Sequence, residues 1–526
     1  MSQAGAETLG QALLAAAEEN PDRILLDGAG RLTAVGALEE ASARVGAAVR
    51  SHGVARGDRV AIMMGNTPEF LEAWFALARQ GIVEVPVHSA YRGPLLEHVL
   101  AESGARVLFV DAEFVERLED LDLPELELLV VRGGDAAPPS SGRPAVALEE
   151  LREHGSRADD AELSGRDTSC ILYTSGTTGP SKGVVLSHNA NLHLARTVIG
   201  LMEYEAKDVL YTAFPLFHVN AKFTSVMTAL LSGSRLVLDQ RFSASAFWDR
   251  MREKGVTAFN YMGSMLTILH KQPERDDDAD NLVRRCYGAA CPAAIWEEVE
   301  RRFGIRLREH YGMTEIGIAT MNTAEATRVG SIGRAAPYFE TRVADGADNE
   351  VATGEVGEIQ VRPKLPDTII DHYWNRPDAT IEAFRNLWFH TGDLATRDED
   401  GYFHYVDRLK DSIRRRGENI SSFEVESVVN THPAVLESAA FGVPSELGED
   451  DVMVAVVLKE DASLTPTELL DFCQPKLAHF AVPRYIAFRD SIPKNASQRI
   501  QKFKLREAGV GADVFDRVAA GYELPR

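Results

Sequence analysis

A repeated order of apolar strand, amphipathic helix and apolar strand is the feature of this chain that most constrains its fold. In one clear instance, residues 59–64 read as a buried strand, Thr67 and Pro68 start a helix, and residues 82–87 form the next strand. Large apolar residues recur at helical spacing between Pro68 and Gly81, and proline is favoured in the first turn of a helix. The order continues to about residue 400. Strands joined by helical crossovers run parallel, so we predict parallel sheets covered by helices.

After residue 407 the pattern changes to shorter elements. We expect a helix at residues 422–432 and strands at residues 436–443 and 452–459. A second helix should begin at the capping box Thr465-Pro466-Thr467-Glu468 and run to about residue 480. The prediction is an α/β protein with a large N-terminal domain of parallel-rich sheets covered by helices over residues 1–407. A hinge at 408–411 and a small α+β C-terminal domain over 412–526 follow.

Charge and apolar patterning exclude several classes of partner. The 56 basic and 79 acidic side chains leave a net charge of −23, which repels nucleic acid and anionic lipid surfaces. No run of about 18 apolar residues and no N-terminal targeting pattern occur, so we expect no membrane span and a cytoplasmic location. The spacing of Cys170, Cys286, Cys291 and Cys473 fits neither a metal cluster nor a disulfide framework, and predicts reduced, buried thiols.

Hydroxyls, glycines and one lysine are concentrated directly after the apolar residues 170–172. Glycines let a backbone approach phosphate closely, amides and hydroxyls donate hydrogen bonds, and Lys182 supplies a positive charge. The segment lacks the ending of a Walker loop, and its composition alone would also suit a flexible linker. It reads Tyr173-Thr174-Ser175-Gly176-Thr177-Thr178-Gly179-Pro180-Ser181-Lys182-Gly183. We interpret it as a polyphosphate-binding loop.

This loop resembles the signature loop of the adenylate-forming superfamily, which includes acyl- and aryl-CoA synthetases, peptide-synthetase adenylation domains and firefly luciferase. The resemblance covers nearly the whole chain, with motifs in the family's order and approximate spacing. It implies ATP or an acyl adenylate, Mg²⁺ and coenzyme A as ligands, and a mobile small domain that rotates between two half-reactions. The implied nucleotide-binding residues are Thr174, Ser175, Gly176, Thr177, Thr178, Gly179, Lys182, Gly288, Ala289, Ala290, Tyr311, Asp393 and Arg408.

Two downstream motifs receive further roles from the resemblance. In residues 311–315, Tyr311 would offer its ring to the adenine, Thr314 its hydroxyl to the α-phosphate, and Glu315 a hard oxygen ligand to Mg²⁺. In residues 390–393, Asp393 would accept the ribose hydroxyls, with Arg408 as its partner on the ribose. The position of Lys410 is the family's hinge, where a polar residue stays solvated in both domain orientations.

The acyl and coenzyme A sites are likewise implied by resemblance. Residues 214–220 resemble the family's acyl-pocket loop, where His218 would form part of the wall rather than transfer a proton. The expected acyl-binding residues are His218, Val219, Tyr261, Gly263, Gly312 and Gly317. Residues 414–420 resemble the coenzyme A loop, in which glycine lets pantetheine pass close to the backbone. The expected coenzyme A contacts are Arg416, Gly417 and Glu418, with Arg484 as a further candidate for a phosphate.

Position 499 departs from the family pattern. The segment Ser497-Gln498-Arg499-Ile500-Gln501-Lys502 has arginine where the family keeps the lysine that assists adenylation. An ammonium is compact, whereas a guanidinium is planar and forked, and a misplacement of about 1 Å can slow such a step on the order of a hundredfold. We therefore favour an enzyme that adenylates poorly or not at all and converts a supplied acyl adenylate into acyl-CoA.

That interpretation requires a partner adenylating enzyme, and other functions stay open. Arg499 would still support adenylation in a complete ATP-dependent acyl-CoA synthetase, and a non-catalytic adenylate or acid sensor would keep the fold without turnover. The coenzyme A loop and hinge speak against a sensor. Transfer to a carrier-protein thiol is a further alternative, although residues 416–420 resemble stand-alone carnitine- and acyl-CoA ligases more closely.

The acid itself is predicted from small residues around the expected pocket. Gly263, Gly312, Gly317 and residues 288–290 would leave room for a bulky group, and the pocket motifs contain no lysine or arginine that would pair with a second carboxylate. A hydrophobic monocarboxylate, aryl or polycyclic, is the prediction, unless the glycines only serve backbone turns. Homodimers are common in folds of this kind, but the sequence does not determine the oligomeric state.

Overall fold

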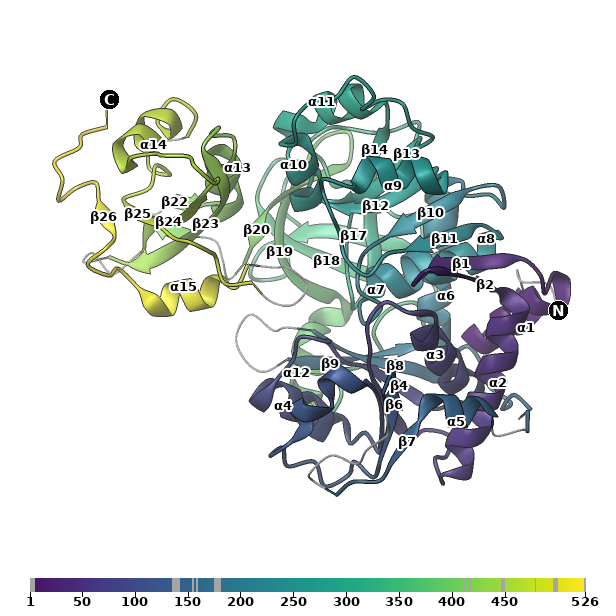
Figure 1. Ribbon diagram of the computed structural model, residues 1–526. Helices are drawn as coiled ribbons and strands as arrows, with labels where there is room; N and C mark the ends of the chain where they lie inside the picture. The colour runs from purple at the N-terminus through teal and green to yellow at the C-terminus, as the bar shows by residue number, and fades with distance from the viewer. Residues whose placement is uncertain are drawn as a thin grey trace. The chain divides into compact units, whose positions relative to one another are not determined.

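The computed structural model divides into two compact units, each with its own hydrophobic core (Figure 1). The first comprises Met1–Glu340 and Arg362–Arg385, and the second Thr341–Val361 and Asn386–Arg526. The structure describes residues 5–134, 142–153, 156–157, 159–174, 181–409, 413–415, 418–445, 450–477, 479–494 and 500–524, with only the backbone of residues 414, 418 and 419.

One sheet of the first unit is built around the predicted strand, helix and strand. Helix α3 (Pro68–Gln80) follows Thr67 with proline in its first turn and ends at Gly81, whose φ of 65° suits glycine. All pairs in this sheet are parallel except the last, β8 with β9. Its order is β7 (Ala145–Ala147), β6 (Leu128–Arg132), β5 (Val107–Asp111), β3 (Arg59–Met63), β4 (Val83–Pro86), β8 (Thr168–Thr174) and β9 (Lys182–Ser187).

A second run of strands in the first unit is parallel from β1 to β14. Strand β2 and the β15–β16 end pair antiparallel. The order is β2 (Arg31–Ala34), β1 (Ile24–Gly28), β11 (Arg235–Leu238), β10 (Val209–Thr212), β12 (Ala258–Met262), β13 (Arg285–Ala289), β14 (Arg306–Met313), β15 (Gly317–Met321) and β16 (Gly333–Ala335). These parallel-rich sheets confirm the predicted fold class.

Helices of the first unit cover these sheets (Figure 1). A π-helical segment, η3, follows directly after α7. Among the described residues, no helix is long and apolar enough to cross a membrane. The helices besides α3 are α1 (Leu9–Glu19), α2 (Val35–Ser51), α4 (Gly93–Ser103), η2 (Ala112–Leu118), α5 (Leu148–Glu153), α6 (His188–Met202), α7 (Val219–Ala221), η3 (Lys222–Met227), α8 (Thr228–Ser232), α9 (Phe247–Lys254), α10 (Gly263–His270), α11 (Ala293–Phe303) and α12 (Pro377–Ala383).

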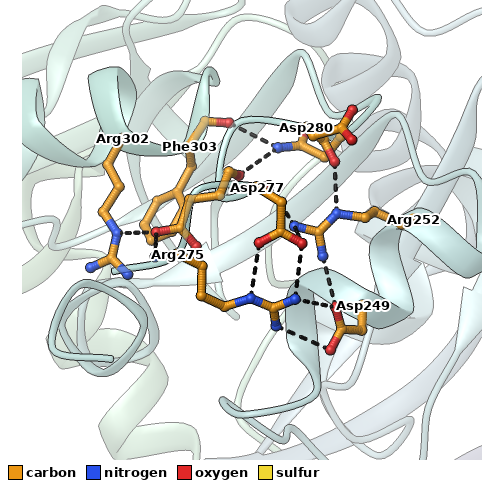
Figure 2. A network of polar contacts seen from close by, with 9 residues as sticks. Asp249, Arg252, Arg275, Asp277, Asp280, Arg302 and Phe303 are labelled. Carbon is orange, nitrogen blue, oxygen red and sulfur yellow. Dashed lines mark hydrogen bonds and ion pairs between the residues drawn. The ribbon is translucent and has the colours of Figure 1, made fainter. Parts of the chain in front are cut away.

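A network of arginines and aspartates fastens the connection between α10 and β13 (Figure 2). Arg275 makes a forked contact with Asp249 of α9 at 3.1 and 3.2 Å, and Arg252 donates to the Asp280 carbonyl at 2.7 Å. Arg302 of α11 donates to backbone oxygens of the same connection. This connection is therefore a structural part of the first unit, in which Arg275, Asp277 and Asp278 form ion pairs.

The described strands of the second unit form three groups. The first has the order β17 (Phe339–Ala344), β18 (Gly357–Pro363), β19 (Phe389–Arg397) and β20 (Tyr402–Arg408), with β19 antiparallel to both β18 and β20. In the second, β21 (Ile413–Arg415) pairs with β22 (Glu418–Ile420). The third sheet has the order β23 (Val435–Pro444), β24 (Asp450–Leu458), β25 (Tyr485–Phe488) and β26 (Phe515–Asp516). The helical segments are η4 (Arg385–Leu387), α13 (Ser422–Asn430), α14 (Pro466–Cys473) and α15 (Lys502–Ala508).

The predicted elements of the C-terminal region occur with one clear difference. The capping box at Thr465 and Glu468 is present, but α14 ends at Cys473 rather than near residue 480. Residues 341–361 and 386–407, which we had assigned to the large domain, group with the second unit because β18, β19 and β20 pair with one another. The hinge at 408–411 stays a prediction, since residues 410–411 lie outside the described residues. All four cysteines are buried and free, as predicted.

Candidate functional site

The stem of the predicted phosphate loop is a tight antiparallel pair in the first unit. Thr174 at the end of β8 lies opposite Lys182 at the start of β9, so the loop between them begins and ends at one place. His98 of α4 contacts the Ser181 carbonyl at 3.0 Å and fixes the returning strand. The predicted contacts Ser175, Gly176, Thr177, Thr178 and Gly179 lie outside the described residues, and their roles stay predictions.

Tyr373 connects the loop lysine with the predicted magnesium ligand. The Tyr373 hydroxyl donates to Glu315 Oε1 at 3.1 Å, while Lys182 Nζ lies 5.1 Å from the centre of the Tyr373 ring. Backbone hydrogen bonds join this segment to both sides, from Trp374 N to Gly183 O at 2.8 Å and from Ile370 N to Glu315 O at 2.6 Å. Burial, together with the Glu315 carboxylate, raises the pKa of Tyr373, so its hydroxyl remains a donor.

Glu315 is buried directly after β14 and Thr314, and its surroundings fit the expected use of Mg²⁺. Among the described residues, no group of three or more acidic, histidine or cysteine side chains could hold a metal ion by itself. Mg²⁺ is commonly held by one or two carboxylates together with substrate phosphates and water. A single glutamate beside a phosphate loop therefore fits a metal that would arrive with a nucleotide.

The turn after β13 approaches the start of α10 at very short backbone range. A Cβ added at Gly263 would lie 1.6 Å from the Ala290 carbonyl oxygen, and one at Gly288 would lie 2.2 Å from the Tyr261 carbonyl oxygen. At Gly312 a Cβ would lie 2.0 Å from the Gly317 oxygen. Backbone packing requires glycine at three of these positions, so their small size does not argue for a bulky acid.

The acyl-pocket loop is held by Asn66, a residue that follows β3 and that the motifs did not indicate. Asn66 donates to the carbonyls of Phe214 and Asp239 at 3.0 and 2.9 Å, and accepts from the Leu216 amide at 2.9 Å. His218 then begins α7 by accepting a hydrogen bond from the Asn220 amide at 3.2 Å. This contact agrees with a wall position for His218.

Val219 lies beside the predicted catalytic residues. It lines a cavity of about 10 Å³ together with Thr314, Glu315 and Gly317. The other lining residues are Leu186, Ala190, Asn191, Leu194 and Thr368. Four positions that sequence reasoning assigned to catalysis or acyl binding therefore meet around one small cavity of the first unit.

The structure corrects the placement of Tyr261. Its side chain is fully buried in the hydrophobic cluster of α9, α10 and α11, and its hydroxyl donates to the Arg308 carbonyl at 3.3 Å. Successive side chains of a strand point to opposite faces, so its neighbour Asn260 faces η3 and donates to Ser225 Oγ at 3.0 Å. Asn260, rather than Tyr261, lies on the side of the acyl-pocket loop.

In the second unit, the predicted ribose residues are neighbours. Asp393 of β19 and Arg408 of β20 are register partners, with Arg408 Nε 3.6 Å from Asp393 Oδ1. Thr391 orients the strand by donating to the Ile359 carbonyl at 2.7 Å and accepting from the Asp393 amide at 3.1 Å. The carboxylate is thus held next to a guanidinium, which suits the binding of a diol.

The coenzyme A candidates are less well placed. Arg484 contacts Asp516 at 3.0 Å and Asp451 at 2.8 Å, and these two carboxylates raise its pKa. Its guanidinium is therefore engaged within the second unit, which gives no support to the predicted phosphate contact. Arg416, Gly417, the Glu418 side chain, Lys410 and Arg499 lie outside the described residues, and their roles stay predictions.

Two lysines near position 499 form ion pairs with glutamates. Lys502 of α15 lies 2.8 Å from Glu426 and also contacts Ser422, and Lys494 pairs with Glu437. Burial raises the pKa of Glu426 and the nearby Lys502 ammonium opposes this shift. Both ammonium groups are therefore committed inside the second unit.

Comparisons with known proteins extend over both units. The model of the AMP-binding enzymes matches residues 13–374, and the model of the AMP-binding enzyme C-terminal domain matches residues 424–499. Crotonobetaine/carnitine–CoA ligase of Salmonella paratyphi B is 33% identical over 465 residues, which cover 87% of this chain and 89% of that protein. Crotonobetaine/carnitine–CoA ligase of Salmonella typhi is also 33% identical, over 86% of this chain and 89% of its own length.

Solved structures share the fold over almost the full length. The anthranilate CoA ligase AuaEII, in complex with anthranoyl-AMP, has a TM-score of 0.87 at 24% identity and covers 99% of this chain and 100% of its own. A benzoate CoA ligase from Burkholderia xenovorans LB400 has a TM-score of 0.84 at 27% identity, over 95% of this chain and 99% of its own.

Proposed function

The chain belongs to the AMP-binding enzymes of the acyl-CoA ligase type, and from that premise we propose that it forms acyl-CoA from an acyl adenylate while adenylating free acids poorly. The observation that carries the proposal is the arginine at position 499 together with the engagement of Lys494 and Lys502 by glutamates. If Lys502 left Glu426, it would leave a largely buried carboxylate without its cation. The Lys494–Glu437 pair is more exposed and holds Lys494 less firmly, so Lys502 is the lysine least able to replace the adenylation lysine.

In the proposed reaction, the coenzyme A thiolate attacks the carbonyl carbon of the acyl adenylate. A carbon–sulfur bond forms, the carbon–oxygen bond to the phosphate breaks, and AMP leaves with the bonding electron pair. In the first unit, Thr314 and Lys182 would hold the phosphate, and Glu315 would hold Mg²⁺, which neutralises phosphate charge when bound. In the second, Asp393 and Arg408 would hold the ribose.

The preceding adenylation is the step that Arg499 would weaken. The carboxylate of the acid attacks the α-phosphate of ATP, and pyrophosphate leaves. This step brings two anions, the carboxylate and the α-phosphate, into contact. A compact ammonium can lie between them, whereas a forked guanidinium requires more space. A partner enzyme that supplies the adenylate, a cytoplasmic location and a homodimeric assembly belong to the same proposal.

The acid is proposed to be an aromatic monocarboxylate. The similarity to a benzoate CoA ligase supports this class. The relatives named for crotonobetaine and carnitine make a quaternary-ammonium acid the second candidate to include in a screen.

The test compares two substrates on the purified protein. Thioester formation is measured with coenzyme A and a synthetic acyl adenylate, and then with free acid, ATP and Mg²⁺. We expect the adenylate to react at least about a hundredfold faster, and Arg499→Lys to raise the rate from free acid and ATP. Arg506→Lys, in the following helix α15, is the matched control and should change neither rate.

Comparable rates from both substrates would mean a complete synthetase. No thioester from any supplied adenylate would instead favour a non-catalytic binding protein, and reaction only with a carrier-protein thiol would replace coenzyme A as the acceptor.

A further inference from the structure

Three buried polar atoms on adjacent strands of the first unit form no hydrogen bond of normal geometry among the described residues, although Thr224 and Asn260 lie near the Tyr287 hydroxyl. They are Asn260 Oδ1 on β12, the Tyr287 hydroxyl on β13 and His310 Nδ1 on β14. Asn260 and Tyr287 are register partners, and the Tyr287 and His310 rings stack with centres 5.1 Å apart. We refer to Asn260, Tyr287 and His310 as the polar cluster.

The polar cluster faces the acyl-pocket segment. Asn260 Nδ2 donates to Ser225 Oγ at 3.0 Å and to the Asn220 side chain, so η3 and α7 cover this face of the strands. Val219, which precedes Asn220, lines the small cavity beside Thr314. The cluster therefore lies next to the place proposed for the acyl group.

Leaving these atoms unpaired is energetically unfavourable. A buried donor or acceptor without a partner costs about 1–3 kcal/mol, and such groups are rare in native proteins. Three together, in side chains as buried as Asn260 and Tyr287, indicate that another polar group completes their hydrogen bonds.

The cluster is uncharged at neutral pH. Burial lowers the pKa of His310 to about 4, against a hydrogen bond with the Gly288 backbone, so the ring is neutral. Burial also raises the pKa of Tyr287, against weaker opposing contacts with the Thr224 and Asn260 side chains, so the hydroxyl keeps its proton. Arg308, on the same face of β14, donates to the Leu201 carbonyl instead. A neutral group that both donates and accepts hydrogen bonds matches this surface best.

We propose that the polar cluster recognises a hydroxyl or amino substituent on the acyl group, an assignment that rests on the proposed acyl-CoA ligase function. The substituent donates a hydrogen bond to Asn260 Oδ1 and forms another with the Tyr287 hydroxyl. An unsubstituted hydrocarbon acid leaves the cluster unpaired and binds more weakly. A quaternary ammonium lacks a proton to donate, so the cluster disfavours it as well.

The test uses matched probes that differ by one polar group. Thioester formation is measured with benzoyl adenylate and with its hydroxy- and aminobenzoyl counterparts, and binding is measured by calorimetry with the corresponding non-hydrolysable acyl-sulfamoyl adenosines. We expect at least one substituted probe to be preferred about tenfold or more in kcat/KM and in affinity. Tyr287→Phe should abolish most of that preference, both in kcat/KM and in affinity.

Tyr211→Phe is the control for loss of a buried hydroxyl, because Tyr211 lies on β10 and packs against Phe247 on the opposite face. It should keep the preference. Equal binding of all probes, or an unchanged preference in Tyr287→Phe, would overturn the inference and leave the cluster to an ordered water only. If the substituted analogues bind preferentially but no thioester forms, the inference stands and the proposed function fails.

Discussion

Glu309 gives the most quantitative prediction of this structure. It is 4% exposed on β14, and its Oε1 accepts from the Cys291 amide at 2.9 Å, in the turn that follows Gly288. Burial raises the pKa of its carboxyl to about 8, against the hydrogen bonds from the backbone of Cys291 and Ala290. The carboxyl is therefore protonated in the folded protein at pH values where it is ionised in the unfolded chain.

The sign of the pH dependence follows from proton binding. Between about pH 4.5 and 8, the folded state holds a proton that the unfolded state has released, so the free energy of unfolding falls as the pH rises. Below this window both states are protonated, and above it both are ionised. Moving the pKa of a carboxyl from 4.5 to about 8 corresponds to a loss on the order of 5 kcal/mol by pH 8.

Glu309→Gln removes this titration and keeps an oxygen for the Cys291 amide. We expect the variant and the wild type to be similarly stable near pH 4.5, and the variant to be more stable by up to ~5 kcal/mol at pH 8.5. Urea unfolding followed by tryptophan fluorescence measures this, because Trp248 and Trp296 lie in the adjacent core. Glu300→Gln is the control, since Glu300 accepts from the Leu307 amide at 2.8 Å but is partly exposed.

The reasoning would be refuted by a stability difference between Glu309→Gln and wild type that is constant from pH 5 to 8.5, or that favours the wild type as the pH rises. An equal alkaline gain in Glu300→Gln would show that general loss of negative charge, rather than burial, is responsible.

Two further predictions concern buried contacts of the first unit. Lys222→Met leaves the fully buried Glu84 carboxylate without its cation and should lower the free energy of unfolding in urea by about 3–5 kcal/mol. The double variant Glu84→Gln/Lys222→Met should recover most of that loss. A double variant as unstable as Lys222→Met alone would contradict this. Gly263→Ala should prevent stable folding because its Cβ would overlap a backbone oxygen. The control Gly200→Ala, in α6, places its Cβ in open space and should be neutral or stabilising by up to about 1 kcal/mol. Similar melting temperatures for the two variants would disprove the argument.

Local signals in the sequence were sufficient for much of the fold. Thr67-Pro68 and Gly81 set both ends of α3, because each residue type suits one helix terminus. The predicted end of α14 was wrong although the signal was present. Gln474 still has helical backbone angles, but Pro475 has no N–H to continue the helical hydrogen bonds, and α14 ends at Cys473. Because the apolar residues beyond Pro475 were counted as helical, the helix was predicted to run to about residue 480.

The site was predictable as motifs but not as contacts. Resemblance indicated Thr314 and Glu315, which the structure places together at one cavity with Val219. It missed Tyr373, whose hydrogen bond to Glu315 joins segments far apart in the sequence and leaves no local pattern. The prediction also assigned acyl binding to Tyr261 instead of Asn260. The alternation of a strand shows that these two side chains point to opposite faces, but it does not show which face the ligand contacts.

The segment around Tyr373 has a consequence for engineering. It runs antiparallel to β9, with hydrogen bonds from Asp371 N to Val185 O at 3.0 Å and from Trp374 N to Gly183 O at 2.8 Å, and Tyr373 also reaches Glu315. An exchange of modules that took β9 from one enzyme and this segment from another would disturb the predicted phosphate loop and the predicted metal ligand Glu315 together. Chimeras of this scaffold should therefore inherit both segments from the same parent.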